Sequence, residues 1–154
     1  MRLAVEVQTA RLAVARATPA QMADLTSLLA RLDAMAGSTQ PPRQRDAYAV
    51  LDLEFHSALA EASENRLLGA AMEVLYHYLV HRTVPVSAAQ QQQLNRSLRT
   101  LLDCGIRAGN ADVAAEAMAQ HLADSYRVMA AARSGGTPDD LLDAAANSCF
   151  TQAE

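Results

Sequence analysis

The sequence is poor in features that mark several classes of protein. It has no tryptophan, aromatic residues make up only 4% of it, and it contains two cysteines, Cys104 and Cys149. Two cysteines do not make a disulfide framework, which favours a reducing cytoplasm. No apolar run is long enough to span a membrane, and the amphipathic N-terminus does not resemble a signal peptide. All 13 basic residues are arginine and 17 residues are acidic, so the net charge of −4 argues against bulk binding of nucleic acid.

What the sequence does contain favours helices. Hydrophobic residues make up 51% of 154 residues, and alanine and leucine supply most of them, which disfavours a β-sandwich or barrel. Prolines, glycines and capping residues divide the chain into segments with helical periodicity. We predict an all-α antiparallel bundle of six helices plus a short C-terminal helix. The expected helices cover about residues 2–16, 19–36, 45–63, 65–82, 87–108, 110–134 and 138–147.

The apolar residues predict which face of each helix is buried. We expect the first helix to bury Leu3, Val7, Ala10 and Val14, and the fourth to lie inside the bundle because it is apolar around much of its circumference. Pro41 and Pro42 predict a loop over residues 38–44. The expected inner stripes of the third and sixth helices are Tyr48, Leu51, Phe55, Leu59 and Ala62, and Val113, Ala117, Met118, Leu122, Tyr126 and Met129. Residues 1–134 are then one bundle, and residues 135–154 a tail.

The third helix carries the residues most suited to chemistry. Asp52 and His56 are four apart, so both lie on one face, which we expect to point inward with Phe55 and Leu59. A carboxylate and an imidazole inside a helical bundle can begin a metal site. From this pair alone, the preferred interpretation is an Asp–His ion pair or a hydrogen-bonded core histidine. His121, on the inner stripe of the sixth helix, becomes a third ligand only if it meets this pair.

Other motifs give weaker evidence of a functional site. His77 and His81 are four apart, but two histidines at a helix end make a weak metal site. The acidic run at residues 139–143 complements the dipole of a short helix. There is no Glu-x-x-His, no glycine-rich phosphate loop and no G-x-S-x-G, and neither cysteine lies in a pattern typical of a nucleophile.

Three ordered blocks resemble a known family. RLAVEVQTARLAVARAT, LDLEFHSALAEASENRLL and GIRAGNADVAAEAMAQHL are similar to the FCD effector-binding domain of FadR-like GntR transcription regulators, over about residues 2–132. The D-x-x-F-H core is intact at Asp52, Phe55 and His56. The resemblance implies a helical bundle, often dimeric, with a central pocket for a small metabolite, commonly a carboxylic acid. It also implies, in many members, a divalent metal held by one Asp and three His.

By position, the resemblance places metal ligands at Asp52, His56 and His121, whereas the fourth position falls on Arg99, which cannot ligate a metal. Three arrangements remain open. The three residues hold zinc, nickel or manganese, with water or effector completing the coordination and His77 as a substitute ligand or effector contact. Alternatively, Arg99 binds the effector's carboxylate without a metal. In the third, Arg99 pairs with Asp52 or points to solvent.

The predicted function is that of a cytoplasmic, non-enzymatic sensor of a small organic acid. The wide apolar faces of the first two helices favour a homodimer. Because the chain starts near the first FCD-like helix and has no basic recognition helix, we expect a truncated regulator or a stand-alone sensor that does not itself contact DNA or membrane. The alternatives are a small metalloenzyme at the same residues and a ligand-free helical dimerisation module.

Overall fold

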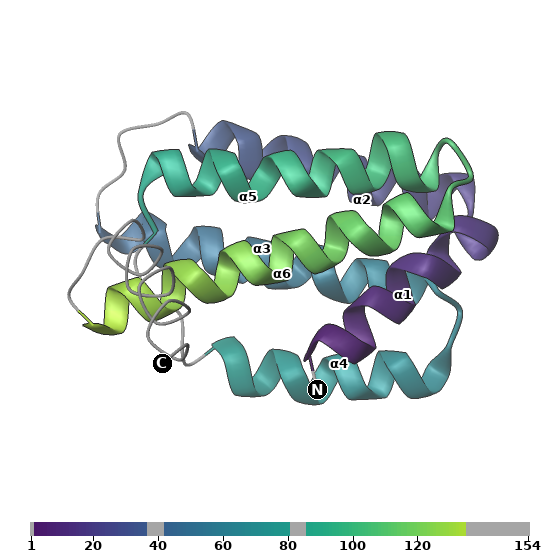
Figure 1. The fold of residues 1–154 in the computed structure, drawn as a ribbon, viewed down its shortest axis with the longest axis horizontal. Coiled ribbons are helices and arrows are strands. Elements are labelled where there is room, and N and C mark those ends of the chain that lie inside the picture. Colours follow the sequence, from purple (N-terminus) through teal and green to yellow (C-terminus); the bar gives the residue numbers. More distant parts are fainter. Residues whose placement is uncertain (1, 37–41, 81–85, 135–154) are drawn as a thin grey trace, which may run out of the picture.

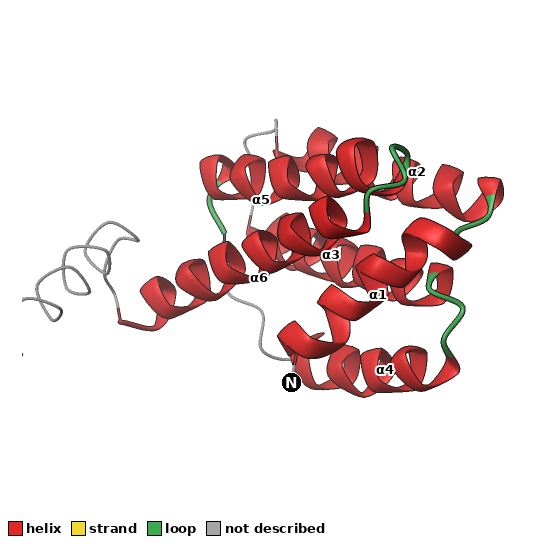
Figure 2. Ribbon diagram, turned by 45° about the vertical axis from the view of Figure 1, so that its right-hand side comes forward, coloured by secondary structure: helices red, strands yellow, loops and turns green. Residues whose placement is uncertain are grey.

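The computed structural model describes residues 2–36, 42–80 and 86–134, and these residues form helices and no strand, as Figure 2 shows. The predicted all-α class is therefore confirmed. His81, the predicted tail helix and the proposed boundary at residue 135 lie outside the described residues. The elements in chain order are α1 (Arg2–Arg16), α2 (Pro19–Ala36), α3 (Pro42–Ala62), α4 (Arg66–Val80), α5 (Ala88–Thr100), a π-helical segment η1 (Leu101–Ile106) and α6 (Ala111–Ser134).

Five of these helices form a closed ring. Helix α1 packs on α3 and α6, α2 packs on α3 and α5, and α5 packs on α6. The order of neighbours α1, α3, α2, α5 and α6 thus returns to α1, and α4 lies outside the ring against α3 and α1. Figure 1 shows α3 and α6 between the α2 and α5 side and the α1 and α4 side. Side chains of α3 and α6 meet in the middle of this ring.

The core follows the predicted stripe of α3. Tyr48, Leu51, Phe55, Leu59 and Ala62 are all buried. They belong to one apolar cluster with residues of α2, α5, η1 and α6. Burying each large apolar side chain contributes about 1.5–3 kcal/mol, so this stripe fixes the rotation of α3. The same rotation turns the Asp52 and His56 side inward.

Helix α1 is rotated relative to our prediction. Its buried residues are Glu6, Thr9, Ala10 and Ala13, whereas Leu3 is 55% exposed. The buried alanines have almost no side chain, so α1 can approach its neighbours closely. The prediction that Leu3 belongs to the inner face was wrong, and the charged residue Glu6 lies there instead.

The prediction that α4 is buried was also wrong. Met72 and Leu75 are buried against α3 and α1, but Leu67 is 83% exposed, and Val74 and Tyr78 are exposed as well. Helix α4 is thus apolar around much of its circumference although it lies at the periphery of the bundle. On α6, Tyr126 is likewise 70% exposed rather than part of the inner stripe.

The predicted helix starts are confirmed by their caps. Thr18 and Gln21 form reciprocal hydrogen bonds at the start of α2, and Ser87 with Gln90 forms a capping box at α5. The side chain of Asn110 accepts a hydrogen bond from the Val113 N–H at the start of α6. Helix α3 begins at Pro42, earlier than predicted, since proline fits the first turn of a helix.

The end of α5 departs from a regular α-helix. The segment η1 is π-helical, and the Arg107 N–H donates to the carbonyl of Leu102, five residues earlier. Gly109 then adopts a φ of 69°, which suits a glycine at a helix end. No helix in the described ranges is long and apolar enough to cross a bilayer.

Gly105 permits the close packing of η1 on α6, which gives a testable prediction. A Cβ at Gly105 would lie 2.8 Å from the backbone Cα of Ala114, whereas a Cβ at Gly69 in α4 would meet no atom within 4 Å. We expect Gly105→Ala to lower the free energy of unfolding by about 1–3 kcal/mol. Gly69→Ala, the control, should raise it by up to about 1 kcal/mol. Urea unfolding followed by circular dichroism measures both, and a Gly105→Ala protein as stable as the wild type contradicts the packing.

Candidate metal centre

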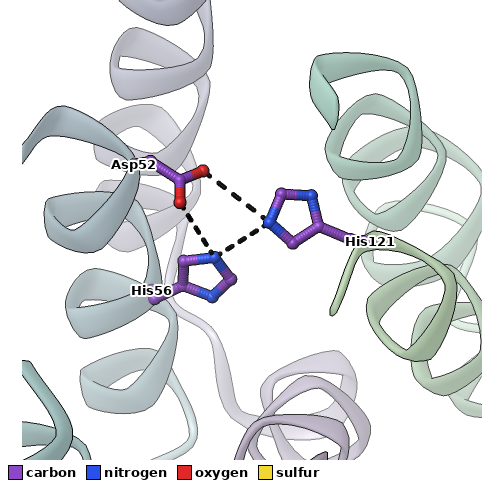
Figure 3. Close-up of side chains that lie close together, drawn as sticks. All are labelled: Asp52, His56 and His121. Atoms are coloured by element: carbon purple, nitrogen blue, oxygen red, sulfur yellow. Dashed lines mark hydrogen bonds and ion pairs between the residues drawn. The ribbon is translucent and has the colours of Figure 1, made fainter. Parts of the chain in front are cut away.

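Three side chains predicted from the sequence meet at the centre of the ring. Asp52 and His56 come from α3, and His121 comes from α6 on the opposite side (Figure 3). His56 is 1% exposed, His121 is fully buried, and the side chain of Asp52 is 14% exposed. His56 and His121 are 65 positions apart in sequence and meet at one buried point. His121 therefore joins the Asp52–His56 pair, which was the condition for a three-residue site.

The distances within this trio suit a common cation. The Nε2 atoms of His56 and His121 are 3.1 Å apart. The Asp52 carboxylate has one oxygen 3.7 Å from His56 Nε2 and the other 3.7 Å from His121 Nε2. Two ligands about 2.0–2.2 Å from one zinc ion lie about 3.0–3.5 Å apart at bond angles of 90–110°. Small movements of Asp52 would place all three donors at bonding distance from one ion.

His121 presents an unprotonated nitrogen to this point. Its Nδ1 lies 3.2 Å from the carbonyl oxygen of Leu94 and 3.3 Å from the Ser97 hydroxyl. Because the Ser97 hydroxyl donates to the same carbonyl, the proton of a neutral His121 ring belongs on Nδ1. Burial lowers the pKa of His121 to about 4, so the ring is neutral at pH 7 and Nε2 has a free lone pair.

His56 is oriented by a carboxylate on the first helix. Its Nδ1 is 2.5 Å from Glu6 Oε2, a close ionic contact without the geometry of a hydrogen bond. Although burial opposes ionisation, the positive charges of His56 and Arg2 lower the pKa of Glu6 to about 2. A carboxylate facing Nδ1 keeps a proton on that nitrogen, so when a metal ion replaces the proton on Nε2, the Nε2 lone pair of His56 faces His121.

The two imidazoles need a shared proton or a metal ion between them. Two Nε2 lone pairs cannot face each other at 3.1 Å unless a proton or a metal ion lies between them. Asp52 Oδ1 is buried beside them and has no hydrogen-bond partner, and such an orphaned carboxylate oxygen is costly unless a cation occupies the site. Carboxylate and imidazole donors fit zinc, nickel or manganese. The residues therefore fit a divalent metal, with Asp52, His56 and His121 as its ligands.

Arg2 places a positive charge beside the Asp52–His56–His121 cluster. Its Nε is 2.5 Å from Glu6 Oε1, and its Nη2 lies 3.4 Å from His56 Nε2. Arg2 and Asp52 both line a cavity of about 60 Å³, which is otherwise mostly apolar. The site therefore contains a metal-type donor set, an ion pair and an adjoining small pocket.

Arg99 lies outside this cluster. Its exposed guanidinium forms an ion pair with Asp33 of α2. Asp33 also accepts a hydrogen bond from Asn95, which in turn accepts one from the hydroxyl of Tyr48, a residue of the cavity wall. Arg99 is thus connected to the cavity wall only through a series of polar contacts that runs by way of Asp33, Asn95 and Tyr48. Neither the predicted pairing with Asp52 nor direct contact with the ligand cluster is present.

His77 is not in the cluster either. It lies on an exposed part of α4, where its ring contacts that of Tyr76. Our sequence reasoning also missed two residues that do belong to the site, Arg2 and Glu6. Their signal was available, since Glu6 is spaced at helical intervals from Ala10 and Ala13, and Arg2 lies one turn before it.

The fold is a ring of helices around a buried Asp–His–His centre. The chain belongs to the FCD domain family, whose model matches residues 1–124. This is a family of regulatory domains and not of enzymes. The expected resemblance is thereby confirmed.

Among solved structures, GntR from Streptococcus agalactiae has a similar fold, with a TM-score of 0.68, 24% sequence identity and a match over 82% of this chain. The match covers 55% of that protein, so the chain spans about half of its length. None of the curated proteins matches this sequence.

Glu6 gives a prediction for stability and its pH dependence. We expect Glu6→Gln to lower the free energy of unfolding of the metal-stripped protein by about 3 kcal/mol, because it leaves half-buried Arg2 and buried His56 without their carboxylate. The folded-state pKa of Glu6 is depressed to about 2 from 4.5, so its stabilisation is complete above pH 5 and is lost as the pH falls toward 2. The difference between wild type and variant should shrink over that range.

The matched control is Glu54→Gln, because Glu54 is an exposed glutamate of α3 facing Arg31 at 3.7 Å. Its effect should be below about 1 kcal/mol at every pH. Chemical denaturation at a series of pH values measures both variants. Equal effects of the two substitutions at pH 7 would show that Glu6 is not a buried partner of His56.

Proposed function

We propose that this chain is the effector-sensing part of a FadR-like GntR transcription regulator, with a divalent metal held by Asp52, His56 and His121. The observation that carries the proposal is the pair of imidazole Nε2 atoms 3.1 Å apart beside a buried carboxylate. The effector is a small carboxylate that binds in the adjoining cavity. Membership of the FCD family supports this reading.

A metal here acts as a Lewis acid that attracts an anionic oxygen of the effector. Three protein ligands leave coordination positions for water or a ligand, unlike closed structural sites with four. Asp52 is the ligand that lines the cavity, so open positions on that side would face the effector. The chain's own role is to orient the donors: Glu6 sets the ring of His56, and the Leu94 carbonyl sets that of His121.

The metalloenzyme alternative finds no support in the site. Glu54, the carboxylate next in sequence to the trio, is exposed and faces Arg31. Glu6 is held by Arg2 and by His56 Nδ1, away from the Nε2 side where a reacting water would lie. A ligand-free dimerisation module does not account for an Asp–His–His trio buried in the core.

The regulator as a whole is expected to act in the cytoplasm as a homodimer. An effector changes DNA binding only to the extent that it binds one arrangement of the dimer more tightly than another. In this proposal the present chain contributes the sensing function, and DNA is contacted by another part of the regulator.

The metal site gives a prediction with an internal control. Zinc added to chelator-treated protein should raise the melting temperature, with a stabilisation of about 2.7 kcal/mol at a free zinc concentration 100 times the Kd. Asp52→Asn and His121→Ala should each abolish most of this shift. His77→Ala should retain it, because His77 is an exposed histidine on α4.

Thermal shift measurements, with metal content determined by elemental analysis, test this prediction. Asp52→Asn preserves the shape of the side chain and guards against loss of folding as the cause. A zinc-induced shift of the same size in Asp52→Asn and His77→Ala would place the metal elsewhere on the molecule.

A further inference from the structure

Helix α4 carries an apolar face that points away from the bundle. Leu67, Val74 and Tyr78 are 83%, 63% and 56% exposed, and they are three of the five large apolar side chains exposed in the described part of the chain. Their spacing of seven and four residues places them on one side of α4, away from Met72 and Leu75, which are buried against α3 and α1. Figure 1 shows α4 at the edge of the molecule. An exposed apolar face of this kind is typical of a protein interface.

The order of residues along this face is symmetric about its centre. Ala70 and Ala71 lie in the middle, Leu67 lies three residues before Ala70, and Val74 lies three residues after Ala71. When two copies of the helix pack antiparallel about a two-fold axis at this centre, Leu67 of each copy faces Val74 of the other. The alanines have small side chains at the crossing point, so the helices can approach closely there. The face is therefore complementary to a second copy of itself.

The charges beside the face fit the same arrangement. Arg66 and Glu73 are exposed on one flank of the apolar face, and antiparallel packing about this axis brings Arg66 of each copy near Glu73 of the other. A parallel arrangement would instead bring like charges together. Glu73 also lines a groove between α3 and α4 together with Glu54 and Glu61, so the surface that receives Arg66 of the second copy is acidic. The charges thus favour a second copy in antiparallel orientation.

We propose that α4 packs antiparallel on α4 of a second copy of this chain, with Leu67 against Val74 and Arg66 paired with Glu73. This inference rests on the homodimer of the proposed function and not on its metal. The contact then lies on α4 rather than on the first two helices, where we expected it. Helix α4 also contributes Leu79 to the wall of the central cavity and packs on α1. A molecule in that cavity and the second copy would therefore contact the same helix.

Sedimentation equilibrium of the 154-residue chain tests this contact, because over about 1–500 µM it measures the dissociation constant of the dimer. Leu67→Glu places a charge in each half of the apolar contact and should raise the dissociation constant by at least about 100-fold. Tyr126→Glu is the control, since Tyr126 is 70% exposed on α6, and it should stay within about threefold of wild type. Leu3→Glu makes the same change on α1 and should behave like the control. Circular dichroism should show unchanged helix content in all three variants, because the side chains they replace are exposed.

An exchange of charges tests the antiparallel geometry. Arg66→Glu and Glu73→Arg each place like charges near each other in both halves of the dimer, and each should raise the dissociation constant about tenfold. The double variant Arg66→Glu/Glu73→Arg restores the opposite charges and should return the dissociation constant to within about threefold of wild type. Two residues that do not contact each other across the dimer would show additive effects instead.

The outcomes separate this inference from the proposed metal site. A wild-type chain that remains monomeric over the whole concentration range overturns the contact on α4, whether or not the chain takes up zinc. A dimer that dissociates in Leu3→Glu but not in Leu67→Glu overturns it as well and places the contact on α1. Charge reversals whose effects add in the double variant overturn the antiparallel pairing. A dimer with the expected response to these variants supports the inference, even where the wild type binds no zinc.

Discussion

Two imidazole nitrogens facing each other across 3.1 Å inside a ring of helices are the constraint on which the centre depends. Each ring is held from behind, His121 by the Leu94 carbonyl and His56 by the Glu6 carboxylate, so neither can turn away without losing a buried polar partner. The two lone pairs that result repel each other unless a proton or a metal ion lies between them. In the metal-free protein a proton between the two Nε2 atoms is enough. The carboxylate of Asp52 beside these atoms also attracts a divalent ion to the same position.

The ring architecture explains how such a point arises. Helices α3 and α6 face each other across the centre, and α1 closes the ring between them. The alanines of α1 let it approach closely enough for Glu6 to reach His56. The polar groups of the centre therefore come from three helices, α1, α3 and α6, and their relative positions depend on the packing of the whole domain. A ligand that joins these groups joins α1, α3 and α6 to one another.

Much of the centre could be read from sequence because helical spacing is a local property. Asp52 and His56 share a face by being four residues apart, and His121 lies between Met118 and Leu122, both buried. Arg2 and Glu6 were missed although the same spacing connects them to Ala10 and Ala13, because α1 is apolar on more than one side and the stripe through Leu3 competes with the correct one. The prediction that α4 is buried was wrong for a related reason. The exposure of Leu67 depends on which helices surround α4, and the hydrophobicity of the sequence does not specify those neighbours. Arg99 was placed by counting back from Gly109 to the position that the family resemblance implies, and such a count does not give the direction of a side chain. In the structure Arg99 is exposed and pairs with Asp33. The buried residue next to Arg99 is Leu98.

The Arg2–Glu6 ion pair contributes little to the stability of the fold, which favours a functional role for it. Burying two opposite charges costs desolvation energy that their attraction barely offsets, and apolar residues of similar volume commonly serve as well or better. Helix α1 already has alanines and valines with which to pack, so the pair is not needed to hold α1 in the ring. It does place a cation with free N–H groups on the wall of a cavity beside a metal-type donor set. A ligand bound in this cavity would contact α1 as well as α3 and α6, since all three helices line it. Its binding would then depend on the position of α1, which is the kind of differential interaction that a sensing mechanism requires.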